Sequence, residues 1–94
     1  MKQKSIFKSN GCYVCGNPYT EEHHVFFGRN RKVSDANGFT VRLCVEHHRG
    51  MYGVHGKYGH ELDMRLKRNM QMAYEMTHSR EDFIGLIGRS YIDE

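Results

Sequence analysis

The sequence of 94 residues lacks tryptophan, has a single proline and contains no long hydrophobic run. A helix that crosses a membrane needs roughly 18 or more apolar residues, so we expect no membrane-spanning segment. The N-terminus has lysines but no apolar stretch behind them, which argues against a secretory signal peptide. We therefore expect a single domain, residues 1–94, located in the cytoplasm. Because so short a chain buries only a small core, a bound metal ion would add much to its stability.

An excess of one charge is also missing, because 14 lysines and arginines against 11 acidic residues leave a net charge of only +3. This balance permits a nucleic-acid partner without requiring one. The three cysteines are an odd number, which does not fit the paired framework of a disulfide-rich secreted domain. Histidine is unusually abundant instead. Four of the seven histidines form two adjacent pairs, His23-His24 and His47-His48.

Two short strands are expected in the first half of the chain. Residues 23–28 (HHVFFG) are rich in β-branched and aromatic side chains and end at a glycine, which is typical of a strand. Residues 29–38 are polar and basic, which predicts a loop or a short helix that ends at Asn37-Gly38. Residues 39–44 (FTVRLC) alternate as in a half-buried strand, with Phe39, Val41 and Leu43 on one face and Thr40 and Arg42 on the other.

The second half of the chain is expected to be helical. The glycine-rich segment 45–59 predicts mostly loop, with at most one helical turn around the paired histidines. A helix from about residue 60 to 78 is indicated by an apolar stripe at helical spacing, and we expect this stripe to be core. A capping box that opens at Ser79 predicts a second helix at about 80–88. The apolar stripe comprises Leu62, Leu66, Met70, Ala73 and Met76.

Two short motifs have the spacing of a structural zinc site. Cys12-x-x-Cys15 and Cys44-x-x-His47 can each present two ligands from one tight turn, and zinc prefers such thiolate and imidazole donors. The two expected strands between the motifs would return the chain to its start. The alternative is a redox-active Cys-x-x-Cys with an unrelated Cys44, which would leave the second motif unexplained. Zinc at these four residues is the better interpretation.

The remaining histidines require a different explanation. Adjacent residues of a strand point to opposite faces, so His23 and His24 can serve different parts of one cleft. A metal ligand beside a histidine that acts as a general base is what phosphodiester hydrolysis requires. The alternative is an ordinary polar start of a strand, with one histidine exposed and the other in a structural hydrogen bond. The second pair, His47-His48, makes the catalytic interpretation the stronger one.

The combined pattern resembles a known family. Cys-x-x-Cys, then HHVFFGRNRK, VRLCVEHH, GVHG and ELDMRLKR, is similar to the zinc-containing HNH endonucleases, and in particular to short HNH proteins of phages and prophages. The likeness covers roughly residues 12–70. It implies an α+β fold: a small ββα-metal, treble-clef-like finger with two zinc knuckles, a core at about 12–78 and C-terminal helices. It also implies a metal-dependent DNA endonuclease that acts in a bacterial host cell.

The resemblance assigns roles to single residues. His24 would be the general base, and His23 and His48 would hold a catalytic divalent metal, Mg²⁺ or Mn²⁺, with Ni²⁺ or Zn²⁺ as alternatives. This metal would contact the scissile phosphate and the 3′ oxygen, so that cleavage leaves a 5′-phosphate and a 3′-hydroxyl.

Two features depart from the family pattern. Phe39 stands where the family has its middle asparagine, so Asn37 is the candidate for that role and Asn30 the second choice, although Asn37-Gly38 is also an ordinary turn. A further family histidine usually follows the paired one after a single helical turn, whereas six residues separate His48 from His55 here. His55 could still reach the cleft from its loop, as a metal ligand or a phosphate contact.

Basic residues near the expected site could bind DNA, mostly through backbone phosphates. The alternative is a solvated basic surface. Four tyrosines could stack on bases or pack on the zinc site, namely Tyr13, Tyr19, Tyr52 and Tyr58. The rival functions are a non-catalytic zinc module that binds nucleic acid or protein, and an RNA-directed nuclease. DNA preference, pathway and oligomeric state are left open. The expected phosphate-binding residues are Arg29, Arg31, Lys32 and Arg42, with Arg49 and Lys57 beyond them.

Overall fold

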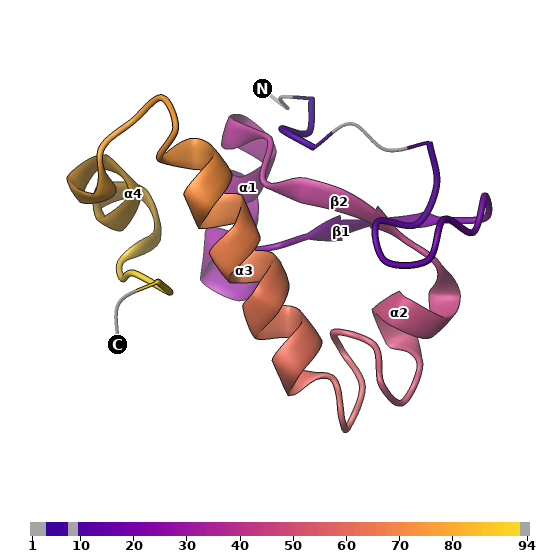
Figure 1. The fold of residues 1–94 in the computed structure, drawn as a ribbon. Coiled ribbons are helices and arrows are strands. Elements are labelled where there is room, and N and C mark those ends of the chain that lie inside the picture. The colour runs from indigo at the N-terminus through magenta and orange to yellow at the C-terminus, as the bar shows by residue number, and fades with distance from the viewer. Residues whose placement is uncertain (1–3, 8–9, 93–94) are drawn as a thin grey trace.

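A short antiparallel sheet with helices around it forms the fold, as seen in a computed structural model that describes residues 4–7 and 10–92. Strands β1 and β2 make up the sheet, with Glu21 opposite Leu43 and His24 opposite Thr40. The chain is a small α+β fold, as expected (Figure 1). Its elements are β1 (Glu21–His24), the 3-10 turn η1 (Gly28–Asn30), α1 (Arg31–Asn37), β2 (Thr40–Leu43), α2 (Val45–Arg49), α3 (His60–Tyr74) and α4 (Arg80–Ile87).

The first strand differs from the prediction for residues 23–28. β1 begins two residues earlier and ends at His24. Beyond it, the backbone of Phe26 bonds to a side chain of α1 instead of a strand: its N–H donates to Ser34 Oγ at 3.2 Å, and its carbonyl accepts from the same hydroxyl at 2.6 Å. These two hydrogen bonds to Ser34 replace the strand-to-strand hydrogen bonds of the sheet, and the chain continues into η1 and α1. Of the two predictions for residues 29–38, the short helix is confirmed, and it ends at Gly38 in the left-handed conformation.

The second strand lies where it was predicted, with one exception in its exposure pattern. Val41 and Leu43 are buried and Arg42 is exposed, as expected of alternation. Thr40, however, is only 2% exposed, although the pattern put it on the solvent side. The reason is the N-terminal segment, where Ser5 donates a hydrogen bond to the Thr40 carbonyl and Ile6 N–H donates to the Gly38 carbonyl.

Helix α3 lies against the sheet and completes the core. Leu66 and Met70 are buried, as the stripe predicted. Met76 is 84% exposed, so its assignment to the core was wrong. The helix ends at Tyr74 rather than near His78, and Met76 therefore lies in the turn that follows. Beyond the stripe, the core contains an aromatic group of Phe26, Phe39, Tyr74 and Phe83, with ring centroids 5.4–6.2 Å apart.

Helix α4 is confirmed together with its capping box. Ser79 Oγ accepts from the Asp82 N–H at 3.0 Å, and the Asp82 carboxylate accepts from the Ser79 N–H at 3.4 Å. The segment after α4 returns to α3, where the fully buried Gln71 accepts a hydrogen bond from the Tyr91 N–H at 2.7 Å. Within the described part of the chain, no helix combines the length and apolarity needed to cross a membrane.

Candidate functional site

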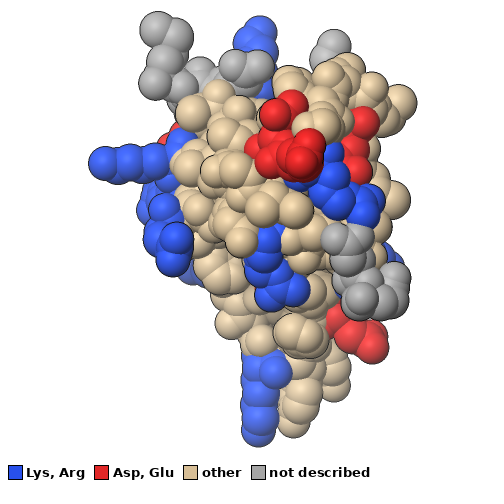
Figure 2. All heavy atoms as spheres, turned by 90° about the vertical axis from the view of Figure 1, so that its left-hand side faces the viewer, with Lys and Arg blue, Asp and Glu red and all other residues tan. Residues whose placement is uncertain are grey.

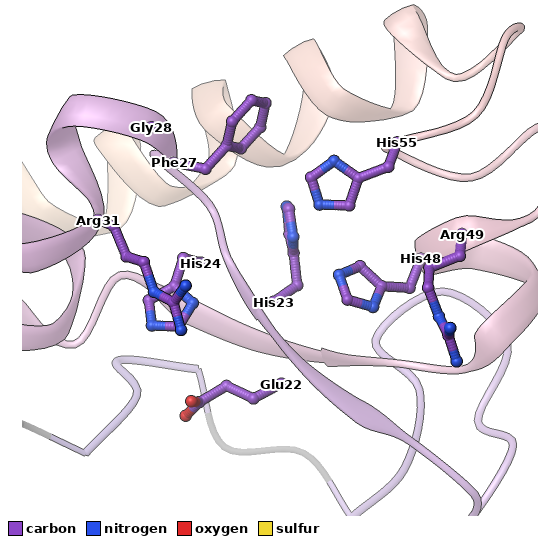
Figure 3. Close-up of a pocket in the computed structure, with 9 residues that line it drawn as sticks. All are labelled: Glu22, His23, His24, Phe27, Gly28, Arg31, His48, Arg49 and His55. Carbon is purple, nitrogen blue, oxygen red and sulfur yellow. The ribbon is translucent and has the colours of Figure 1, made fainter.

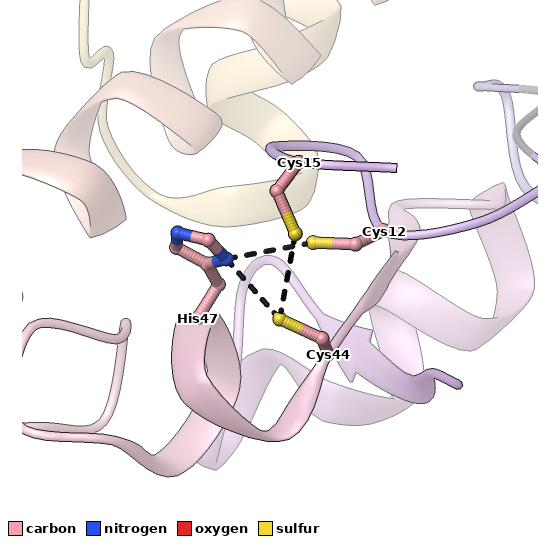
Figure 4. Close-up of side chains that lie close together, drawn as sticks. All are labelled: Cys12, Cys15, Cys44 and His47. Carbon is pink, nitrogen blue, oxygen red and sulfur yellow. Dashed lines mark hydrogen bonds between the residues drawn. The ribbon is translucent and has the colours of Figure 1, made fainter. Parts of the chain in front are cut away.

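The four predicted zinc ligands lie together, with their donor atoms within 4.8 Å of one another (Figure 4). Cys15 Sγ and Cys44 Sγ are 3.7 Å apart, and His47 Nδ1 is 3.2 Å from Cys44 Sγ and 3.7 Å from Cys12 Sγ. In a tetrahedron around zinc, with Zn–S bonds of about 2.3 Å, neighbouring donors are separated by roughly 3.5–3.8 Å. This Cys₃His cluster could therefore bind a structural metal such as zinc.

Tight local turns bring these ligands together. Gly16, at φ 80°, donates its N–H to the Cys12 carbonyl at 2.8 Å and so closes the turn between the two cysteines. Cys44 follows β2 directly and is the N-cap of α2, which places His47 one helical turn later. Burial raises the pKa of the Cys12 thiol, but hydrogen bonds from the backbone of Cys44, Cys15 and Val14 outweigh it and lower this pKa to about 6. Cys12 is therefore prepared to bind a cation as a thiolate.

A second cluster consists of His23, His48 and His55. Their ring centroids are 5.0–5.2 Å apart in all three pairs, and their nitrogens lie within 4.8 Å of one another. Figure 3 shows the three imidazoles converging from β1, α2 and the loop beyond α2. His23 is 1% exposed, and its Nε2 is buried without a hydrogen-bond partner among the described residues. Such an orphaned buried nitrogen is rare and marks a position where a ligand is expected.

Burial determines the charge state of this cluster. Burial, and then the neighbouring His48, His55, Lys67 and His24, lower the pKa of His23 to about 3. Burial and His48 also lower the pKa of His55. His23 is therefore neutral at pH 7, and its unpaired Nε2 offers a lone pair, which is the form in which imidazole binds a metal ion.

His48 is oriented by a carboxylate that the sequence reasoning missed. Glu21 Oε1 accepts a hydrogen bond from His48 Nδ1 at 2.8 Å, and the same carboxylate accepts from the Arg49 guanidinium. Hydrogen bonds from His48 and Arg49 lower the pKa of Glu21. Because Glu21 bonds to Nδ1, Nε2 is the nitrogen of His48 that is left for a metal ion, an arrangement common for histidines that bind metals. The sequence EEHH held the signal, since alternation puts Glu21 on the face of His23.

A tightly wound loop after α2 positions His55. Its N–H donates to the His48 carbonyl at 3.0 Å, and the N–H of Val54 donates to the His47 carbonyl at 2.9 Å. A methyl group at Gly59 would lie 1.6 Å from the Gly53 carbonyl oxygen, so this close backbone packing excludes any side chain there. The side chain of His55 therefore lines the pocket, a position that the sequence analysis allowed for.

His24 points to the opposite face of β1, as alternation requires (Figure 3). Its Nε2 lies 2.7 Å from Asp35 Oδ1 of α1. Because a carboxylate accepts hydrogen bonds, Nε2 donates in this contact, and Nδ1 is the ring nitrogen that the contact leaves for a substrate. Asp35 was also missed, and no local pattern shows that this turn of α1 faces β1.

Both faces of β1 border one pocket with a volume of about 580 Å³. Its lining includes His23, His48 and His55 together with His24, so the three-histidine cluster and His24 border the same space. Arg31 and Arg49 contribute guanidinium groups to its wall. The full lining is Glu22, His23, His24, Phe27, Gly28, Arg31, His48, Arg49 and His55 (Figure 3).

The proposed middle residue of the HNH motif is not in this pocket. Asn37 ends α1 and donates to the Val33 carbonyl at 2.9 Å, within its own helix. Asn30 donates to the Ile87 carbonyl at 3.1 Å and ties α1 to α4. Phe39 is fully buried in the core. The catalytic role suggested for Asn37, with Asn30 as second choice, is therefore corrected: both side chains bond to backbone elsewhere.

The predicted phosphate-binding residues are dispersed. Arg31 lines the pocket, whereas Arg29 and Lys32 are exposed and do not. Arg42 bonds to Thr20 Oγ1 at 3.0 Å beside a different hollow. Figure 2, a view from the side of α4, shows Lys and Arg side chains in several separate groups, with Asp and Glu gathered mainly in the upper part. A single continuous basic patch is not seen on this face.

Of the three groups of side chains that could hold a metal ion, the third being Glu22, His24 and Asp35, the Cys₃His cluster and the three-histidine cluster differ in access. The Cys₃His cluster is built on the buried Cys12 and Cys44, while the three-histidine cluster opens into the pocket. Closed thiolate sites are typical of structural metal, and open imidazole sites of catalytic metal. No protein-family model, curated protein or solved structure matches this chain.

Proposed function

We propose that this protein is a metal-dependent DNA endonuclease of the HNH type, built on a ββα-metal finger. The observation that carries the proposal is His23 Nε2, buried and unpaired among the described residues, on a ring that lies against His48 and His55 beside an open pocket. A protein that only needed this histidine for packing would have paired or solvated the nitrogen. The order of β1, β2 and α2, with Cys44, His47 and His48 at the strand–helix junction, is consistent with such a finger.

The donor set at the open cluster fits a divalent cation. A donor set of three imidazoles suits Zn²⁺ or Ni²⁺ better than Mg²⁺, which prefers oxygen ligands, and Mn²⁺ accepts both. His23, His48 and His55 would hold the ion, with Glu21 fixing the ring of His48. When bound, the ion would neutralise charge that develops on the phosphate and the leaving oxygen.

The chain's own groups supply the remaining chemistry. His24 Nδ1, the ring nitrogen left open by the Asp35 contact at Nε2, accepts a proton from the attacking water. The imidazolium that forms is stabilised by the Asp35 carboxylate. Arg31, in the same pocket wall, binds the phosphate and orients the strand. Since adjacent strand residues diverge, base and metal ligands approach the phosphate from two sides of β1.

The rival function, a non-catalytic zinc module, accounts for the Cys₃His cluster alone. It gives no reason for the unpaired His23 nitrogen, nor for the pairing of His24 with Asp35. An RNA-directed nuclease would use the same groups, so substrate class is a matter for experiment.

The test is nicking of supercoiled plasmid, with a structured RNA in parallel, by zinc-loaded protein supplied with Mg²⁺, Mn²⁺, Ni²⁺ or Zn²⁺. We expect His24→Ala to keep its zinc and its fold and to lose cleavage by about 10²–10⁴-fold, the usual contribution of general acid–base catalysis. His60→Ala, at the exposed start of α3, is the matched control and should cut normally. Equal cleavage by His24→Ala would remove this residue from the mechanism. Absence of cleavage with every metal and substrate would favour the binding module.

A further inference from the structure

A second hollow, separate from the histidine pocket, lies between the loop after α2 and the first turns of α3. Its volume is about 390 Å³, and Tyr52, Tyr58, Glu61, Leu62, Arg65 and Arg68 line it. The proposed cleavage chemistry uses none of these residues. His55, which lines the histidine pocket, belongs to the same loop as Tyr52 and Tyr58.

Two tyrosines stack on one another at this hollow while remaining open to solvent. The rings of Tyr52 and Tyr58 have centroids 5.3 Å apart and an interplanar angle of 28°. Their exposed fractions are 68% and 53%, although large aromatic side chains contribute most to stability when buried. The backbone N–H of Tyr58 donates to the Met51 carbonyl at 2.8 Å, which fixes the spacing of the two rings. The pair is an ordered aromatic platform at the surface.

Cations surround this platform. Lys57 Nζ lies 5.4 Å from the centroid of the Tyr58 ring, and Arg65 and Arg68 are exposed one turn apart on the same side of α3. Within residues 4–7 and 10–92, neither guanidinium forms an ion pair. Glu61 is the one carboxylate in the lining, so positive charge exceeds negative charge at the hollow. Unpaired cations beside exposed aromatic faces are complementary to a polyanion with flat rings.

We propose that this platform binds single-stranded DNA next to the cleavage site, with a base stacked on the Tyr52–Tyr58 pair and backbone phosphates bound by Arg65 and Arg68. Bases of an intact duplex are stacked inside the helix and cannot reach a tyrosine face, so unpaired nucleotides are the expected ligand. The inference rests on the proposed nuclease function for its biological meaning, and it deepens that function: the preferred substrate is DNA with an unpaired segment at the cut.

The test measures binding without cleavage, by fluorescence anisotropy of labelled 12-mers with zinc-loaded protein and no added divalent metal. The probes are oligothymidine, an abasic oligomer of equal charge, and a blunt duplex. We expect oligothymidine to bind about tenfold more tightly than the abasic oligomer, the usual effect of stacking one base on an aromatic ring. Tyr52→Ala and Tyr58→Ala should remove this difference, while Tyr52→Phe and Tyr58→Phe should retain it. Arg65→Ala should weaken the binding of both single strands.

The matched control is Tyr19→Ala, which deletes a tyrosine that is 83% exposed and lies far along the chain from the platform. It should bind like the wild type. Equal binding of oligothymidine and the abasic oligomer by the wild type, or unchanged binding by both alanine variants, would overturn the proposal. Plasmid nicking by the same preparations separates the two hypotheses. Cleavage without base-dependent binding would refute the platform alone, whereas base-dependent binding without cleavage with any metal would refute the nuclease alone.

Discussion

At the scale of single residues, the buried and unpaired nitrogen of His23 should destabilise the folded protein, and the proposed function uses the same nitrogen to bind a metal ion. A buried polar atom without a hydrogen bond destabilises a fold by about 1–3 kcal/mol. His23→Leu removes the unpaired nitrogen and keeps a side chain of similar size. In zinc-loaded protein without added divalent metal, we expect the variant to gain about 1 kcal/mol in the free energy of unfolding, measured in urea.

The same substitution should abolish binding at the open cluster. Titration calorimetry with Ni²⁺ would then show one binding event fewer than in the wild type, while the zinc content stays unchanged. A variant that is less stable than the wild type and still binds Ni²⁺ would show that His23 serves packing and not metal.

Glu21 permits a second prediction at this scale. Carboxylates that hold a ligand histidine typically change metal affinity by about 10- to 100-fold when they are lost. Glu21→Gln should weaken Ni²⁺ binding within this range, because a neutral amide no longer fixes the His48 ring by a charged hydrogen bond. Glu46→Gln removes an exposed carboxylate from α2, the short helix that carries His48, and is the control. Equal losses in both variants would indicate an effect of net charge only.

At the scale of elements, helix α4 depends on its N-cap residue, Ser79. Ser79→Ala deletes the acceptor of the capping box and should lower the free energy of unfolding by about 1 kcal/mol. Ser79→Gly should lower the free energy of unfolding by only a few tenths of a kcal/mol, since glycine is itself tolerated at N-caps. Thermal melts of the two variants provide the comparison. If alanine and glycine cost the same, the side-chain bond would not be the source of stability.

The junction between α3 and α4 gives a pH-dependent prediction. Hydrogen bonds from Arg80 and Gln71 lower the pKa of Glu75 from its ordinary value of 4.5. A carboxyl group with a lowered pKa in the folded state stabilises the protein above pH 4.5, and this contribution is lost as the pH falls through the lowered value. Glu75→Gln should therefore be about 0.5 kcal/mol less stable than the wild type at pH 7, as expected of a partly exposed ion pair.

This difference should shrink when urea denaturation is repeated near pH 4. The expectation fails if the stability gap is the same at both pH values, because the interaction would then not depend on the ionised carboxylate.

The parts of the fold and of the site that could be predicted are those fixed by residue spacing within one turn. Cys12-x-x-Cys15, Cys44-x-x-His47 and the capping box at Ser79 each act within one turn, so sequence alone located them. Asp35 and Glu21 depend on which face of a neighbouring element meets the site, which spacing does not reveal. Met76 was misplaced because a helical stripe does not show where the helix ends. Asn37 was misplaced because its side chain bonds within its own helix.

At the scale of the whole molecule, the Cys₃His cluster joins the N-terminal turn to the junction of β2 and α2. A domain with so small a core relies on such a cross-link for much of its stability. Cys12→Ser, or removal of zinc by a chelator, should abolish cooperative unfolding, measured by circular dichroism. His23→Leu is the informative comparison, because it alters only the open cluster and should unfold cooperatively. A chelator-treated protein that melts like the untreated one would refute a structural role for the metal.

Adjacent positions in α2 belong to different clusters, since His47 completes the first and His48 the second. A five-residue helix has little stability of its own, so its orientation depends on its tertiary contacts, among them the Cys₃His cluster at its first turn. Under the proposed function, the two ions would then load in a fixed sequence, zinc before the catalytic ion. Chain stripped of zinc could not regain activity from any excess of Mn²⁺ or Ni²⁺, and supplying zinc first would restore it.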